Sequence, residues 1–255
     1  GGGQVGDTGE IVAAAGRMKV GDTQQVMPDL IVQFGRVVEG AMEMGDAVDA
    51  YVDSVRRQDT ARNHTATHLL HAALRQVLGA HVRQAGSLVA PDRLRFDFSH
   101  VEAMTDGEIE RVQLLVNEKI RQNVGVHGTE DTYAAAVERG ALAFFGDKYE
   151  TTVRLVEIAN GATFSFEVCG GTHVERTGAI GAVYILGESS IGSGMRRIEA
   201  VSGRAAERVV GERFSREARL ARRLHAAPPE LEARVQGLLD ELGDLKQRNE
   251  ALERR

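Results

Sequence analysis

The spacing of apolar residues changes along the chain, and these changes constrain the fold more strongly than any other feature of the sequence. In residues 1–53, short β-prone runs are separated by Gly-Asp turn pairs at 21–22 and 45–46, a pattern typical of strands joined by tight turns. From about residue 55, apolar residues recur at helical spacing, and strand-like and helix-like segments then follow one another in blocks. Because strands and helices do not alternate strictly, we predict an α+β fold.

The pattern also divides the chain. We predict a small β-barrel over residues 1–55, an α+β domain over residues 56–202 and a helical segment over residues 203–255. In the middle part, an apolar stripe from Leu69 to Leu78 predicts a helix that begins near residue 55 and ends at Gly79, with Asn63 as a candidate N-cap. Further helices are expected at about 106–123 and 133–139, and strands at about 86–89, 94–98, 152–158, 163–168, 179–188 and 195–201.

The last segment carries a heptad pattern after Pro228-Pro229. One seam position holds Leu231, Leu238, Leu245 and Leu252, and the other holds Val235, Leu242 and Asn249. This spacing predicts the start of a coiled coil, through which two copies of the chain would form a homodimer. The alternative is a short helix that packs on the chain's own domain.

Composition excludes several classes of protein. With 255 residues, of which 42% are hydrophobic, the chain can bury a sizeable core. It contains no apolar run near the ~18 residues that a membrane span requires, so we expect a cytoplasmic protein with no membrane partner. The net charge of −6 argues against a uniformly basic nucleic-acid surface. Local groups such as Arg216, Arg219, Arg222 and Arg223 can still contact phosphates, or they form a solvated helix face.

Two short motifs carry metal-binding residue types. His64 and His68 are four residues apart on the first predicted helix, so both imidazoles project from one face. Such pairs are also common as surface or capping residues. Cys169, the only cysteine, and His173 are joined by Gly170-Gly171, which lets the backbone turn tightly enough for a thiolate and an imidazole to converge.

Together the motifs supply a Cys-His₃ set, which suits one tetrahedral Zn²⁺ per chain. Four protein ligands usually form a closed structural site, so a catalytic role requires a loose ligand or an expanded coordination number. A zincin peptidase needs a glutamate directly after the first histidine, where this chain has Thr65. The glutamate and Pro-Cys-x-x-Cys pattern of cytidine deaminases is missing as well.

The two motifs resemble the zinc motifs of alanyl-tRNA synthetase editing domains. The resemblance covers essentially the whole chain and rests on Asn63–Leu70 and Cys169–His173, with further similar segments at 2–9, 84–89, 94–100, 143–149 and 194–200. The C-terminal heptads are similar to the start of that family's coiled coil. Free-standing editing proteins that act in trans share the zinc motifs and remain an alternative, and the threonyl-tRNA synthetase editing domain has a similar fold.

The resemblance implies an aminoacyl-tRNA deacylase that hydrolyses Ser-tRNA(Ala) and Gly-tRNA(Ala). In that family, alanine is attached to tRNA(Ala) by a separate aminoacylation domain that uses ATP and Mg²⁺, and this chain does not resemble that domain. Ligase activity is therefore not expected from these residues. The implied partner is tRNA(Ala) mischarged with serine or glycine.

The resemblance also implies roles for single residues. The zinc ligands would be His64, His68, Cys169 and His173. Gln84 would line the editing pocket and orient the reactants as a candidate catalytic residue, and Thr67 and Ser87 would shape the pocket. The Thr67 hydroxyl would recognise that of a bound serine, or else bond its own helix backbone.

Arg196 and Arg197 are candidates for holding the terminal phosphates of the tRNA, and a buried structural ion pair is the alternative. Two other functions stay open for the whole chain. One is a non-catalytic, zinc-stabilised module for tRNA binding or dimerisation, and the other is a zinc hydrolase of small esters. Only the latter would work without tRNA.

Overall fold

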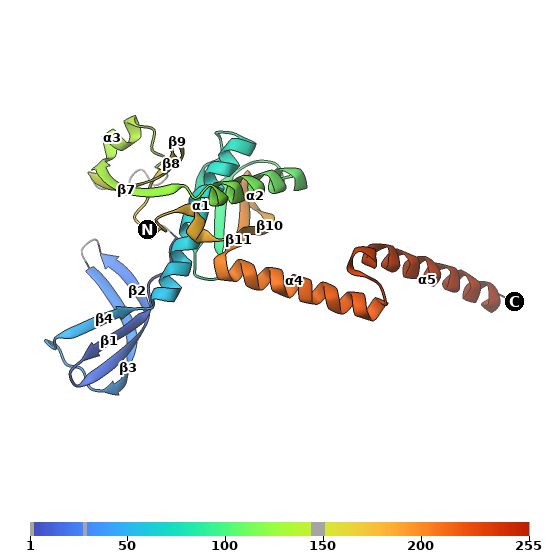
Figure 1. Ribbon diagram of the computed structural model, residues 1–255, viewed down its shortest axis with the longest axis horizontal. Helices are drawn as coiled ribbons and strands as arrows, with labels where there is room; N and C mark the ends of the chain where they lie inside the picture. Colours follow the sequence, from blue (N-terminus) through green and yellow to red (C-terminus); the bar gives the residue numbers. More distant parts are fainter. Residues whose placement is uncertain (1–2, 28–29, 144–150, 255) are drawn as a thin grey trace. The chain divides into compact units, whose positions relative to one another are not determined.

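The computed structural model describes residues 3–27, 30–143 and 151–254 (Figure 1). The chain divides into two compact units, Gly1–Ala206 and Glu207–Arg255. Sheets and helices both contribute to the first unit, which confirms the predicted α+β class. Separate domains for residues 1–55 and 56–202 stay a prediction. The segment at 143–149, one of those that carry the family resemblance, lies outside the described residues except for Ala143.

The N-terminal strands do not close into the predicted barrel. Four strands form an antiparallel sheet in the order β3-β2-β1-β4, with bounds β1 Gly9–Ala13, β2 Gly16–Met27, β3 Leu30–Gly40 and β4 Val48–Val52. Closure would require β3 to pair with β4, and no such pairing occurs among the described residues. In the described residues, β3 pairs along its length with β2, and every residue of the short β4 pairs with β1, so β3 and β4 are the two edge strands. The described sheet is therefore open.

The first helix, α1, spans Ser54–Leu78 and ends at the predicted Gly79. Its N-cap is Asp53, whose carboxylate accepts a hydrogen bond from the backbone N–H of Arg56 at 2.9 Å. The predicted N-cap, Asn63, is wrong, because the first turns of α1 are polar and precede the apolar stripe that suggested it. Asn63 is buried within the helix, where its amide donates to the carbonyl of Ala90 at 2.7 Å and accepts from Ser202 at 2.7 Å.

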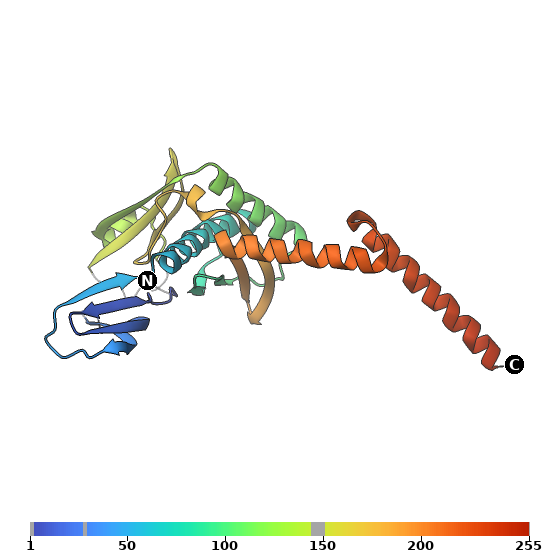
Figure 2. The same cartoon turned by 60° about the horizontal axis from the view of Figure 1, so that its bottom comes forward.

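A second antiparallel sheet, in the order β10-β11-β6-β5, builds the core with α1 and α2. Its strands are β5 Gln84–Val89, β6 Leu94–Ser99, β10 Val183–Gly192 and β11 Met195–Ser202, and α2 is Asp106–Arg121. Leu69, Leu70 and Leu74 of α1 are fully buried in one cluster with Phe96 and Phe98 of β6. Burying each such side chain contributes about 1.5–3 kcal/mol, so this layer fixes α1. Helices α1 and α2 lie side by side (Figure 2).

A third sheet, in the order β7-β8-β9, delivers the second metal-binding motif. Its elements are β7 Gly125–Thr132, α3 Tyr133–Glu138, β8 Thr152–Asn160 and β9 Ala162–Val168. The two-residue period of β9 puts Ser165 and Glu167 on one buried face, and Cys169 continues this alternation just beyond the strand. Because β9 contacts α1, the strand points this face towards the helix that carries His64 and His68. A short 3₁₀ helix, η2, spans Thr177–Ile180.

The C-terminal residues are helical, as predicted. They form α4 (Gly203–Leu224), the 3₁₀ helix η3 (Pro228–Glu230) and α5 (Leu231–Glu253). The seam residues Val235, Leu242, Leu245 and Leu252 of α5 are exposed. Pairing of this seam as a coiled coil stays a prediction. No helix in the described part of the chain is long and apolar enough to cross a membrane.

Candidate metal centre

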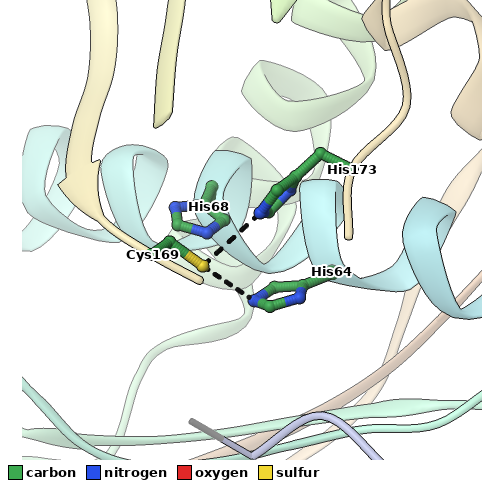
Figure 3. A group of neighbouring side chains, drawn as sticks. All are labelled: His64, His68, Cys169 and His173. Atoms are coloured by element: carbon green, nitrogen blue, oxygen red, sulfur yellow. Dashed lines mark hydrogen bonds between the residues drawn. The ribbon is translucent and has the colours of Figure 1, made fainter. Parts of the chain in front are cut away.

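Four side chains from two distant segments meet at one point (Figure 3). His64 and His68 lie one turn apart in the middle of α1, whereas Cys169 and His173 lie on the loop that follows β9. The ligand atoms of all four lie within 4.8 Å of one another. The structure thus brings together the complete set that the sequence suggested.

The distances in this cluster fit a zinc-sized ion. The Cys169 sulfur lies 3.3 Å from Nε2 of His64 and 3.4 Å from Nε2 of His173. Ideal tetrahedral Zn–S and Zn–N bonds place sulfur and nitrogen about 3.6 Å apart. Thiolate and imidazole are also the donors that select zinc over magnesium or calcium. The cluster can therefore hold such an ion with small adjustments.

An acceptor outside the cluster fixes the tautomer of His64. Its Nδ1 lies 2.7 Å from the side-chain oxygen of Gln4, and the same oxygen accepts from the backbone N–H of Thr172 at 2.9 Å. Because a backbone N–H can only donate, the Gln4 atom at this position is the amide oxygen, and Nδ1 of His64 must carry the proton. Nε2 of His64 then presents its lone pair to the centre.

His173 is fixed in the same way by Thr65. The Thr65 hydroxyl donates its one proton to the carbonyl of Ala61 at 3.0 Å and accepts from the backbone N–H of Val174 at 3.2 Å. Nδ1 of His173, 3.2 Å from this hydroxyl, must therefore donate to it. His173 also directs an unprotonated Nε2 towards Cys169.

A carboxylate backs the third histidine. Glu167 is buried, with one oxygen 3.1 Å from Nδ1 of His68 and the other 2.9 Å from Nδ1 of His71. Ser165 donates a further hydrogen bond to it at 3.1 Å. Carboxylate–histidine pairs of this kind orient metal-binding imidazoles and make them more basic.

The buried charges stabilise one another. Burial disfavours the charged form of His68, but the charges of Glu167 and Cys169 outweigh it and raise the pKa of His68 to about 10. Burial likewise opposes ionisation of Cys169, yet the charge of His68 lowers the pKa of this thiol well below its usual value. The pKa of Glu167 is also lowered despite its burial, chiefly by His68. The pKa of His173 falls to about 4, mainly because of burial. A metal ion bound at Nε2 of His68 would replace a proton there.

The loop between Cys169 and His173 is held closely against α1. A side chain at Gly171 would place its Cβ 1.9 Å from the ring of His64, so only glycine fits at this position. Arg154 of β8 donates to the carbonyls of Cys169 and Gly171 at 3.1 and 2.6 Å. Close approach to His64, rather than a positive φ, therefore explains Gly171.

An open pocket of about 710 Å³ adjoins this loop. It is lined by Gln4, Val5, Gly6, Asp7, Asp22, Thr23, Gln24, Gln25, Ile31, Gly170 and Gly171. The lining mixes polar and apolar groups, and its volume is large enough for a small-molecule-sized moiety. None of Thr67, Gln84 and Ser87 lines it.

The residues predicted to line an editing pocket keep that role as a prediction. Gln84 donates a hydrogen bond to the hydroxyl of Ser87 at 3.0 Å within β5, which brings these two together. The Thr67 hydroxyl donates to the carbonyl of Asn63 at 2.8 Å, so it bonds its own helix backbone. It keeps its capacity to accept a hydrogen bond but has no proton left to give.

Arg196 and Arg197 each bind a carboxylate on a neighbouring strand. Arg196 binds Glu188 of β10 through two nitrogens, and Arg197 binds Asp97 of β6 at 2.7 and 2.8 Å. This arrangement favours the ion-pair alternative, and a contact with tRNA phosphates stays a prediction. Any phosphate would compete with these carboxylates for the guanidinium groups.

The sequence analysis missed the outer partners of the cluster, Gln4, Thr65, Glu167 and Arg154. One signal was present, because a strand that continues into Cys169 places Glu167 on the same face as the cysteine. Nothing local marks Gln4, which is 60 residues from His64 and 168 residues from Thr172.

Comparison with known proteins agrees with this site. Residues 153–199 match the family model described as threonyl and alanyl tRNA synthetase second additional domain. The alanine–tRNA ligase of Chloroflexus aurantiacus is 50% identical over 260 residues, which cover 98% of this chain and 29% of the relative. Those of Dehalococcoides mccartyi and Pelotomaculum thermopropionicum are each 46% identical, covering 99% and 100% of this chain and again 29% of each relative.

The chain thus spans less than a third of the length of the curated relatives that it matches. The match to the family model includes Cys169 and His173, and the longer matches cover nearly the whole chain. Over almost all of its length, the chain is therefore homologous to one segment of the alanine–tRNA ligases, which includes the second additional domain of threonyl- and alanyl-tRNA synthetases.

Proposed function

We propose that this chain is the editing part of an alanine–tRNA ligase and that it hydrolyses Ser-tRNA(Ala) and Gly-tRNA(Ala). The main support is the Cys-His₃ cluster, whose distances suit zinc, in a segment homologous to alanine–tRNA ligases. Attachment of alanine with ATP and Mg²⁺ belongs, in this proposal, to parts of the relatives that the chain does not span. The proposed site of action is the cytoplasm, where charged tRNA is used.

His64, His68, Cys169 and His173 would hold the zinc ion. When bound, zinc supplies Lewis-acid chemistry that can polarise an ester carbonyl or hold the amino acid. The protein's own groups orient the reactants. Gln84 donates one N–H to the hydroxyl of Ser87. Its amide oxygen and second N–H would then position the ester and a water molecule.

Thr67 would supply selectivity for serine. Since its hydroxyl already donates to Asn63, it can only accept a hydrogen bond from the hydroxyl of a bound serine. Alanine offers no such donor. Glycine lacks the hydroxyl as well, so its removal would depend on its small size rather than on Thr67. Discrimination through one hydroxyl in a site built to bind it can be large.

Contact with the RNA backbone would fall partly to α4. Arg216, Arg219 and Arg223 follow one another at spacings of three and four residues, so they share one face of the helix. All three are exposed, and within the described residues none of them forms an ion pair. Guanidinium groups suit phosphate geometry, which supports tRNA as the partner.

A second candidate function is a zinc-stabilised module that binds tRNA or dimerises without catalysis. Four protein ligands complete a tetrahedral site, which is typical of structural zinc. The exposed leucines of α5 favour pairing of two chains. If the chain is such a module, it is neither the editing part of a ligase nor a free-standing editing protein, because both of these hydrolyse mischarged tRNA.

The deciding experiment measures hydrolysis of Ser-tRNA(Ala), Gly-tRNA(Ala) and Ala-tRNA(Ala) by the chain with one equivalent of zinc. We expect the first two substrates to be cleared and the third to be spared. Gln84→Ala should slow hydrolysis while zinc content and circular dichroism stay unchanged. A folded, zinc-loaded chain that clears none of the three would overturn the editing proposal and leave the binding module. Hydrolysis of small esters without tRNA would instead indicate a general esterase.

A further inference from the structure

We propose that Gln4 is a positioning residue of the metal centre, which holds His64 and the Cys169–His173 loop in the arrangement that binds the ion. This inference rests on the metal site of the proposed function, but it does not depend on the proposed substrate. It assigns a role to residues 3–5, which contribute no ligand to the cluster.

One oxygen atom of Gln4 joins the two halves of the site. It accepts from Nδ1 of His64 at 2.7 Å, and from the backbone N–H and hydroxyl of Thr172 at 2.9 and 3.2 Å. The first contact reaches α1, and the other two reach the loop between Cys169 and His173. Gln4 therefore connects the helix that supplies two ligands with the loop that supplies the other two.

The backbone around Gln4 is held firmly by β5. Residues 3–5 run parallel to this strand, with the N–H of Val89 donating to Gly3 at 2.7 Å and the N–H of Val5 donating to Val89 at 2.9 Å. Gly3 has a φ of +83°, and a Cβ there would lie 2.3 Å from the hydroxyl of Ser87. The glycine lets the segment lie flat on the strand, and the two backbone hydrogen bonds fix the backbone position of Gln4.

Residues 3–5 also contact the residues that are predicted to line the editing pocket. Gly3 lies against Ser87, which accepts from Gln84, while the next residue reaches His64. A shift of residues 3–5 would therefore disturb both the metal centre and the residues expected to position the substrate. Residues 3–5 thus connect the metal centre with the residues expected to position the substrate.

Losing the Gln4 oxygen should weaken metal binding through two effects. The proton of His64 would no longer be confined to Nδ1, so a fraction of the imidazoles would present N–H to the ion instead of a lone pair. The loop would also lose its link through Thr172. Outer partners of metal-binding histidines typically contribute about 10–100-fold to metal affinity.

The test compares Gln4→Met, which keeps the length of the side chain but removes the acceptor, with Gln4→Glu, which restores an acceptor. Gln33→Met, at an exposed position of β3, is the matched control. Zinc affinity is measured by competition with a chelator. We expect about a 10–100-fold loss in Gln4→Met, recovery of most of it in Gln4→Glu and no change in Gln33→Met. Equal affinity in Gln4→Met and the wild-type chain would overturn the proposal.

A second readout uses the unmodified chain and does not depend on any variant folding. Long-range ¹⁵N NMR reports which ring nitrogen of His64 carries the proton when zinc is bound. Protonated Nδ1 is expected, and metal bound at Nδ1 would contradict the proposal. Neither measurement involves tRNA. A failure to deacylate tRNA would therefore count against the proposed function alone, and unaltered zinc binding would count against Gln4 alone.

Discussion

Glu167 and His68 form a buried pair, with a carboxylate oxygen 3.1 Å from Nδ1 of the imidazole. The pair connects β9 with α1 at the metal-binding cluster, of which His68 is a member. It lies 99 positions apart along the sequence (167 − 68), so it exists only because the third sheet contacts α1.

We predict that Glu167→Gln lowers zinc affinity about 10–100-fold, because it removes the negative charge that lies 3.1 Å from Nδ1 of His68. Chelator competition measures the effect. Glu157→Gln on the neighbouring strand β8 serves as the control and should bind zinc normally. Unchanged affinity in Glu167→Gln would show that the carboxylate does not support His68.

We expect the thiol of Cys169 to be ionised well below its usual pKa when no metal is bound. The cause is the charge of His68, which outweighs the effect of burial. A cation nearby stabilises the thiolate and lowers the pKa, so His68→Gln must raise it. The ultraviolet absorbance of the thiolate, followed against pH in the metal-free chain, gives both midpoints. Coincident midpoints would refute the pairing.

Zinc should stabilise the folded chain in proportion to its affinity. A free zinc concentration of about 1,000 times Kd adds about 4 kcal/mol to the free energy of unfolding. A chelator is therefore expected to lower Tm, and titration should reach saturation at one zinc per chain. His173→Ala should lose most of this response, whereas His225→Ala on the C-terminal segment should keep it. Zinc-independent melting of the wild-type chain would contradict the metal assignment.

The packing of α1 depends on Phe96, which is fully buried and lies 5.1 Å from the ring of His71. Phe96→Ala should lower the free energy of unfolding by about 3–5 kcal/mol, because it removes buried area and leaves a cavity. Phe214→Ala removes a side chain that is 66% exposed and should change stability little. Denaturant unfolding compares the two. Similar losses would mean that the core is not where the structure puts it.

Neutralising the arginine face of α4 should weaken tRNA binding in a salt-dependent way. If Arg216, Arg219 and Arg223 each contact a phosphate, replacing all three by glutamine lowers the slope of log affinity against log salt by about 2–3. Fluorescence anisotropy with labelled tRNA measures this slope. Arg17, Arg121 and Arg139 are exposed but ion-paired, and their triple replacement is the control. Equal slopes in the two variants would remove α4 from the interface.

The sequence alone determined the features that depend on local spacing. The four-residue spacing of His64 and His68 and the glycines after Cys169 were enough to propose the ligand set, and apolar periodicity was enough to find α1 and its end at Gly79. It failed where the local signal was ambiguous. Asn63 precedes the apolar stripe, but the polar turns that begin at Ser54 were already helical.

Only the tertiary structure decided how the ligands are supported. In the part of the chain that the structure describes, the N-terminal sheet is open because its edge strands β3 and β4 do not pair, and strand pairing cannot be read from strand pattern alone. Gln4 and Thr65 fix the tautomers of His64 and His173, and Glu167 lies 3.1 Å from Nδ1 of His68, all through contacts across distant segments. Hydrogen bonds between residues so far apart depend on how the sheets pack on α1, whereas residue spacing describes only the few turns around each residue.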